Sequence, residues 1–222
     1  MQFIFDASSL IALGQTCLLE IAKGIKEKTG SEFFIPETVF EEVVKRPLHI
    51  KRFELNAVRI KRAIDSGVFE VKGLQNRHGF DEIQEIANNC FYSKGKPIRL
   101  LQGGEIAALA LARETGARGF VIDERTTRLL IEAPEKLRQL LQKRRNKEIS
   151  VDREKAKIIS SMFSGLNIVR SVELIALAFE QNILSEILPK GRQSLEAALY
   201  AAKYSGCAVS SGEIDFFLRG QK

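Results

Sequence analysis

Short apolar runs alternate with longer stretches of helical spacing along this chain. The short runs predict β-strands at Gln2–Phe5, Glu32–Ile35, Val68–Val71, Gly119–Ile122 and Asn167–Arg170. Between them, apolar residues recur three and four positions apart, which is typical of helices that bury one face. Because strands and helices alternate, the pattern predicts an α/β fold with three layers, α/β/α, around a mainly parallel sheet.

Helical spacing covers most of the remaining chain. It predicts helices at Leu10–Lys28, Glu37–Lys45, His49–Asp65, Gly79–Tyr92, Glu105–Glu114, Pro134–Lys157, Val172–Gln181 and Gln193–Tyr204, with another beginning at Glu124. Ser93–Pro97 is rich in turn formers and predicts a loop, whereas Ser210-Ser211-Gly212-Glu213 fits the capping box that opens a short helix. No repeat or flexible linker interrupts the pattern, so we expect a single domain over residues 1–222.

Composition narrows the class of protein. The chain has 222 residues, 45% hydrophobic and 28% charged, as in ordinary soluble proteins. Its net charge of +6 favours polyanionic partners such as nucleic acid, although many basic proteins bind none. Cys17, Cys90 and Cys207 form no close pair, which favours free thiols in a reducing compartment. No apolar stretch is long enough for a membrane span and no leader is visible, so we expect a cytoplasmic protein without membrane contact.

Two of the predicted strands end in an aspartate. Asp6 follows Gln2–Phe5, and Asp123 follows Gly119–Ile122. Open α/β sheets build their sites at the carboxyl ends of their strands, so these carboxylates are candidates for one shared pocket. Each aspartate also precedes a predicted helix, and capping that helix is the structural alternative for both.

Acidic residues also lie on or beside the apolar faces of two predicted helices. Glu105 shares its face with apolar residues one and two turns on, where a carboxylate is costly unless something pairs with it. Its alternative role is that of a first-turn glutamate favoured by the helix dipole. Glu41 and Glu42 flank the apolar face of their helix about equally, so periodicity does not choose between them. Either one also fits a surface acid paired with Lys45 or Arg46.

As a set, these acids predict a cation. Carboxylates that converge raise one another's pKa, and a bound Mg²⁺ or Mn²⁺ removes that penalty. Mg²⁺ prefers oxygen ligands and completes its shell with water and substrate phosphate, so the scarcity of histidine in this chain is no obstacle.

The segments around these acids resemble the motifs of the PIN-domain ribonucleases. Asp6-Ala7-Ser8-Ser9-Leu10-Ile11 is similar to that family's opening motif, and Ile35-Pro36 through Glu42 to its second. Gly104-Glu105-Ile106-Ala107-Ala108-Leu109-Ala110 is similar to the third, and Phe120-Val121-Ile122-Asp123-Glu124 to the fourth. In the second motif the acid lies six residues past the proline, which favours Glu42 over Glu41.

The resemblance implies a fold, an activity and a site. The fold would be a PIN-like three-layer α/β/α, often dimeric, and the activity a hydrolysis of RNA phosphodiesters that depends on Mg²⁺ or Mn²⁺. The resemblance assigns the cation to four carboxylates, with one more acid as an outer ligand: Asp6, Glu42, Glu105 and Asp123, then Glu124. Ser8 would support the first of them through a hydrogen bond.

This chain departs from the family pattern in several places. Residues 47–96 and 134–161 look like helical insertions, and 185–222 like a helical C-terminal extension. Small toxin-type members are much shorter, so a simple toxin role is not implied. Val121 stands where many members place Thr or Ser, two residues before the acid of the fourth motif.

Basic residues within the two apparent insertions are candidates for binding the RNA backbone. The candidates for phosphate contacts are Lys51, Arg52, Arg59, Lys61 and Arg62 in the first insertion, Lys143, Arg144, Arg145 and Lys147 in the second, and Arg128 after the fourth motif. Such contacts give affinity without reading sequence. Solvated helix faces are the structural alternative.

The sequence therefore leaves two functions open. The first is a metal-dependent ribonuclease whose partners are RNA, a second copy of the chain, and a protein inhibitor or RNA-processing partner. The second is a module of the same fold that binds RNA or protein with little catalysis.

Overall fold

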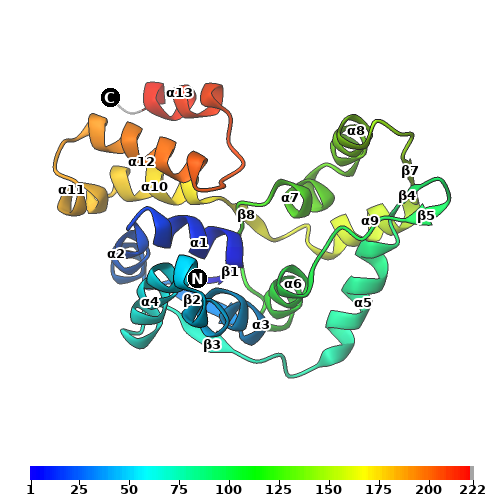
Figure 1. Ribbon diagram of the computed structural model, residues 1–222, viewed down its shortest axis with the longest axis horizontal. Helices are drawn as coiled ribbons and strands as arrows, with labels where there is room; N and C mark the ends of the chain where they lie inside the picture. The colour runs from blue at the N-terminus through cyan, green and yellow to red at the C-terminus, as the bar shows by residue number, and fades with distance from the viewer. Residues whose placement is uncertain (221–222) are drawn as a thin grey trace.

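The computed structural model describes residues 1–220, and a five-stranded parallel sheet lies at its centre (Figure 1). The strands follow the order β3 (Glu70–Lys72), β2 (Glu32–Pro36), β1 (Gln2–Phe5), β6 (Gly119–Val121) and β8 (Asn167–Val169). Every neighbouring pair is parallel. The predicted α/β class and parallel sheet are thus confirmed.

Alternating strand side chains divide the interior into two apolar cores, one on each face of the sheet. Phe5 and Val121 belong to the first, and Ile4 and Phe120 to the second. The first core is covered by α1 (Ala7–Gln15), α2 (Leu19–Thr29), α4 (Lys51–Asp65), α10 (Ser171–Glu180), α11 (Ile183–Ile187), α12 (Arg192–Tyr204) and α13 (Ser211–Gly220). The second is covered by α5 (Arg77–Asn88), α6 (Gly103–Thr115), α7 (Arg125–Glu132), α8 (Pro134–Arg145) and α9 (Arg153–Met162). This is the predicted three-layer arrangement.

Two predicted helices in the first 50 residues are broken in the structure. The Leu10–Lys28 helix is two helices, α1 and α2, because Cys17 between them has a φ of 61° that no α-helix accommodates. The Glu37–Lys45 helix begins as α3 (Glu37–Phe40) and widens into the π-helical turn η1 (Glu41–Lys45). A 3₁₀ turn, η2 (Pro47–His49), then leads into α4.

A small antiparallel sheet replaces two stretches predicted otherwise. The Gly79–Tyr92 helix ends at Asn88, and the chain continues as β4 (Phe91–Ser93) and β5 (Lys96–Pro97). Lys94 and Gly95 between them both have positive φ, which suits a tight hairpin turn, so Ser93–Pro97 is more than a loop. The Pro134–Lys157 helix is interrupted by Asn146 at a φ of 48° and by strand β7 (Ser150–Val151). Phe91 and Tyr92 satisfy helical spacing and strand spacing alike, which explains the wrong prediction.

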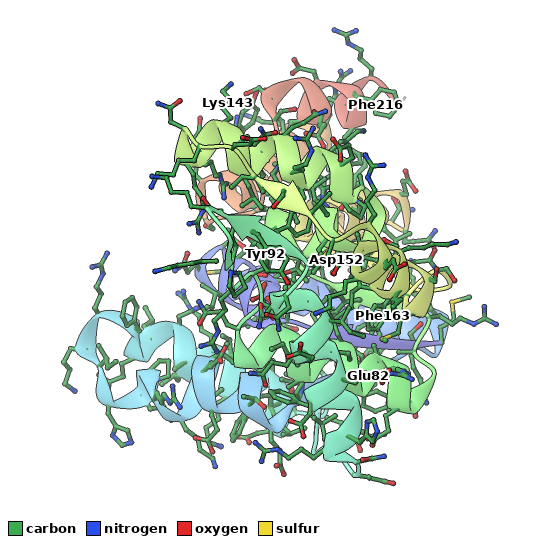
Figure 2. The ribbon with its side chains drawn as sticks, turned by 90° about the vertical axis from the view of Figure 1, so that its right-hand side faces the viewer. Glu82, Tyr92, Lys143, Asp152, Phe163 and Phe216 are labelled. Carbon is green, nitrogen blue, oxygen red and sulfur yellow. The ribbon has the colours of Figure 1, made fainter. Side chains whose placement is uncertain are left out.

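Strands β5, β4 and β7 join the two segments predicted to be insertions. Phe91 pairs with Val151 and Tyr92 with Ser150. The backbone N–H of Asp152 also donates to the Cys90 carbonyl at 2.8 Å. Figure 2 shows Tyr92 and Asp152 near each other, with Lys143 of α8 at the rim of the same side. Residues 47–96 and 134–161 are therefore in direct contact.

Two sequence predictions, on the cysteines and on membrane-spanning segments, can be compared with the structure. Cys17, Cys90 and Cys207 are all free thiols. Within residues 1–220, no helix combines the length and the apolar character that crossing a membrane requires.

Candidate acidic site at the sheet switch point

The site lies where the strand order reverses. From β1 the chain goes to β2 on one side, and from β6 it goes to β8 on the other. Since β1 and β6 are neighbours, with Phe5 beside Val121, their carboxyl ends meet at this switch point. Crevices at such points are the usual ligand sites of open α/β sheets. Asp6 directly follows β1, and Asp123 lies two residues after β6.

Asp6 is held by the first turn of α1. Its side chain is 3% exposed and accepts hydrogen bonds from the Ser8 backbone N–H at 2.9 Å and the Ser8 hydroxyl at 2.7 Å. Asp6 is therefore the N-cap of α1, so the capping role given as its structural alternative is confirmed. The Ser8 hydroxyl in turn accepts from the backbone N–H of Asp123 at 3.0 Å, so one serine joins the two strand ends.

Asp123 is anchored by the far end of the chain. It is 1% exposed, and it accepts from the backbone N–H of Ser171 at 2.7 Å and from the Ser171 hydroxyl at 2.6 Å. The N-cap of α7 is Glu124, which accepts from the Thr127 N–H at 2.8 Å, so the capping alternative for Asp123 is wrong. Ser171 was not among the predicted site residues, because no local pattern links the first residue of α10 to an aspartate after β6.

Glu105 faces the same region from α6. Its carboxylate accepts from the Gln102 N–H at 2.8 Å and from the Thr127 hydroxyl. Burial is the main cause that raises the pKa of Glu105 to about 7; the two hydrogen bonds oppose the shift, and the charges of Asp6 and Glu124 add to it. Thr127 is fully buried, and sequence reasoning did not select it.

The two glutamates of η1 have different surroundings. Glu41 forms an ion pair with Lys45 on the surface. Glu42 lies against the first turn of α6: a β-carbon on Gly104 would come within 2.6 Å of its carboxylate oxygen. Glycine is therefore required at position 104 for this approach. Burial raises the pKa of Glu42, Asp6 raises it further, and Arg46 and the Gly104 N–H lower it.

Asp6 interacts electrostatically with each of the other three acids of the site. Burial raises its own pKa, against the hydrogen bonds from Ser8, and the charge of Asp123 adds to the increase. Burial likewise raises the pKa of Asp123, while Ser171 lowers it. Because the charge of Asp6 also acts on Glu42 and Glu105, all four acids share one electrostatic environment.

The donors fit a hard divalent cation in kind, because all are carboxylate oxygens. Their raised pKa values are the penalty that a cation would remove. Within residues 1–220, however, no three acidic, histidine or cysteine side chains are arranged so that they could hold an ion as they stand. The carboxylates would have to move closer together to bind one ion.

The basic candidates do not form one stripe. Those of α4 cover the first core, whereas Lys143, Arg144 and Arg145 end α8 over the second. Within α4, Lys51 pairs with Glu54 and Lys61 with Asp65. Arg59 donates to the Gly14 carbonyl at 3.3 Å. Arg52 and Arg62 are exposed, as is Lys147 beyond α8.

Arg128 differs from the other basic candidates. It lies in α7, one residue after the threonine that contacts Glu105, and is partly buried. Among the described residues its buried Nε has no hydrogen-bond partner. A buried guanidinium nitrogen without a partner is costly, and an anionic ligand is one way to satisfy it.

A parallel five-stranded sheet with buried acids at its switch point defines a doubly wound α/β protein with a candidate metal-dependent site. A family model, DUF3368, described as PIN domain, matches residues 2–135. This is more than half of the chain, and the chain therefore belongs to the PIN-domain family, whose members are generally nucleases. Comparisons with curated proteins and with solved structures gave no match.

The family assignment confirms the resemblance seen in the motifs. The matched region contains all four acids and Ser8, and it runs through the whole of segment 47–96. It ends at residue 135, so Ser171 and all of α9 to α13 lie beyond it.

Proposed function

We propose that this protein is a ribonuclease that hydrolyses RNA phosphodiester bonds with the help of Mg²⁺ or Mn²⁺. The observation that carries the proposal is that four carboxylates come together at the sheet edge. Ser8 joins Asp6 and Asp123 after β1 and β6, and Glu42 of η1 lies against the first turn of α6, which carries Glu105. Family membership and the net charge of +6 support a nucleic-acid substrate.

The ligands of the cation would be Asp6, Glu42, Glu105 and Asp123, with Glu124 in an outer position. When bound, the cation would polarise a phosphoryl oxygen and favour ionisation of an attacking water. Asp123 need not leave Ser171, because each carboxylate oxygen has two lone pairs. Ser8 would keep Asp6 and the backbone of Asp123 in register.

Substrate contacts are proposed for basic residues that form no ion pair within the described residues 1–220. Arg128 would bind the phosphate nearest the acids through its unsatisfied Nε. Lys143, Arg144 and Arg145 would contact the backbone of the RNA farther away, as would Arg52 and Arg62 on the opposite side. A homodimer, a protein inhibitor or RNA-processing partner, and a cytoplasmic location in which the three thiols stay reduced belong to the same proposal.

A matched pair of variants tests the proposal. Asp6→Asn keeps a side chain that can cap α1 but removes the charge; Asp152→Asn makes the same change at the N-cap of α9, whose Asp152 accepts from Glu154 and Lys155. With a fluorescently labelled single-stranded RNA and Mn²⁺, we expect Asp6→Asn to lose about 100-fold or more of the cleavage rate, as is typical when one group that stabilises the transition state is lost. Asp152→Asn and the unaltered protein should cleave alike, and EDTA should stop both.

Equal cleavage by Asp6→Asn and Asp152→Asn would refute the assignment of the site.

A second candidate function is a binding module with little catalysis. One observation favours it: within residues 1–220, the acids are not arranged around a position that could hold an ion. Thermal unfolding separates the two, since an ion that binds the native state raises the melting temperature by mass action. A melting temperature insensitive to millimolar Mn²⁺, together with retained RNA binding, would favour the binding module.

A further inference from the structure

The loop between α12 and α13 reaches back to the acidic site. Figure 1 shows this loop descending from the C-terminal helices toward the end of β8. Its Ala208 N–H donates to the backbone carbonyl of Asp123 at 3.1 Å, and the Cys207 thiol lies close enough to the Asp123 carboxylate to lower its pKa. A segment 85 residues away in sequence therefore contacts one of the proposed metal ligands through both main chain and side chain.

Arg170 fixes this loop. Its side chain is buried, 6% exposed, and its Nη1 donates to the Ala208 carbonyl at 2.9 Å and to Glu213 at 2.9 Å. On its other side the guanidinium pairs with Glu173, with Nε at 3.0 Å from a carboxylate oxygen. A buried arginine needs such partners, because an uncompensated charge in the interior is strongly destabilising.

Glu213 connects the guanidinium to helix α13. Its carboxylate accepts from the Ser210 N–H at 2.9 Å and the Ser210 hydroxyl at 2.8 Å, and Ser210 accepts from the Glu213 N–H at 3.2 Å. This is the capping box predicted from the sequence. Burial acts to raise the pKa of Glu213, but the bonds from Ser210 and the pairing with Arg170 outweigh it and lower that pKa to about 2. The pairing is thus ionic at all ordinary pH values.

We propose that Arg170 and Glu213 are positioning residues for Asp123, acting through the loop Cys207–Ser210. The chain of contacts runs from α13 through Glu213 and Arg170 to Ala208 and so to Asp123, while Ser171, next to Arg170, holds the Asp123 carboxylate directly. The C-terminal extension, which the PIN family match does not reach, then completes the acidic site. The part of this inference that concerns metal binding rests on the proposed function; the part that concerns the position of Asp123 does not.

The test compares two arginine–glutamate ion pairs whose glutamates have similar exposure, although Arg170 is buried and Arg113 is exposed. Glu213→Gln weakens the pair with Arg170. Glu82→Gln weakens the Arg113–Glu82 pair between the last turn of α6 and α5, two helical turns from Glu105; the two glutamates are 45% and 34% exposed. Amide hydrogen exchange of the metal-free full-length chain is measured at Ser171 and Ala208, which donate to Asp123. The amides of Glu154 and Lys155 serve as an internal reference for local opening elsewhere.

We expect Glu213→Gln to speed exchange at Ser171 and Ala208 about fivefold or more, with the reference amides unchanged, because local opening is released without global unfolding. Glu82→Gln should leave all four amides as they are. Unchanged exchange at Ser171 and Ala208 in Glu213→Gln, or an equal increase in both variants, would overturn the proposal.

A second readout links position to chemistry. In Mn²⁺ titrations followed by melting temperature, Glu213→Gln should need about tenfold more Mn²⁺ for half of the maximal shift, whereas Glu82→Gln should need no more than the unaltered protein. A normal Mn²⁺ response in Glu213→Gln despite faster exchange would refute the link from the loop to the ligand set. If the unaltered protein neither binds Mn²⁺ nor cleaves RNA, the nuclease proposal fails, while the exchange result still decides whether Arg170 and Glu213 position Asp123.

Discussion

The aspartates and the glutamates of the site are held in different ways. Asp6 and Asp123 follow strands, are almost fully buried, and are fixed by serines through bonds of 2.6 to 2.9 Å. Glu42 and Glu105 project from helical turns and owe their positions to a glycine contact and a threonine. The two aspartates are therefore fixed by the sheet and its adjoining helices, whereas the two glutamates can change position more easily. Closing around a cation should therefore move the glutamates more than the aspartates.

The largest effect expected on stability tests the glutamate side. The pKa of Glu105 is raised to about 7 from an ordinary value of 4.5, so the native state binds more protons than the unfolded state between these pH values. Stability is therefore lost as the pH rises through that window. Glu105→Gln removes this loss, because its amide can still accept from Gln102 and can donate to Thr127.

In EDTA at pH 8, we expect Glu105→Gln to unfold with a free energy about 1 to 3 kcal/mol higher than the unaltered protein. At pH 4 the carboxyl is protonated in both states, and the difference should vanish. Urea unfolding at the two pH values measures both. A variant that is less stable at pH 8 would show that Glu105 is not a destabilising buried charge.

An effect of comparable size but opposite sign tests the aspartate side. Ser8→Ala removes the hydroxyl that donates to Asp6 and leaves the Asp123 N–H without its partner. An orphaned buried donor costs about 1 to 3 kcal/mol, so urea unfolding should show a loss in that range. The matched control is Ser160→Ala, because the buried Ser160 hydroxyl has no hydrogen-bond partner among residues 1–220. We expect a near-zero change there, and equal losses in both variants would argue against the serine link.

The smallest stability effect should accompany a clear loss of metal response. Gly104→Ala forces the Glu42 carboxylate to move, since the new methyl would lie 2.6 Å from its oxygen. The displaced atoms belong to a flexible side chain, and alanine favours the helix, so the free energy of unfolding should change by less than about 1 kcal/mol. Yet the melting-temperature shift caused by Mn²⁺ should fall, because Glu42 leaves the site.

Gly103→Ala is the control for this change, because its nearest neighbour, a Thr38 methyl, is 3.9 Å away. It should keep the full Mn²⁺ response. If Gly104→Ala also keeps the full Mn²⁺ response, Glu42 is not a ligand. Only Glu105 would then remain to be compared with the two aspartates.

The sequence predicted the aspartate half of the site more directly than the glutamate half. Asp6 and Asp123 end apolar runs, and a strand end is a position that spacing alone can locate. Glu42 could not be separated from Glu41 by helical angle, because the two flank the apolar face about equally. The structure adds that η1 is a π-helical turn, in which α-helical angles do not hold. Only the spacing of the family motif selected Glu42.

The residues that contact the acids from distant segments could not be predicted from the sequence. Ser171, Thr127 and Cys207 contact the acids through chain folding, and none belongs to a motif that marks its role. The parallel sheet was predictable because each strand carries its own apolar pattern. Strand β4 was not, because its pairing with β7 depends on a segment about 60 residues later in the chain.

The small sheet β5-β4-β7 has a consequence for how this protein can be shortened. Residues 134–161 supply β7, and removing them alone would leave β4 paired only with β5, with its other edge open at Phe91 and Tyr92. An open strand edge of that kind recruits strands from other molecules. Shortened versions of the protein should therefore keep residues 134–161 together with β4, because segment 47–96 also carries β3 of the central sheet and cannot be removed with them.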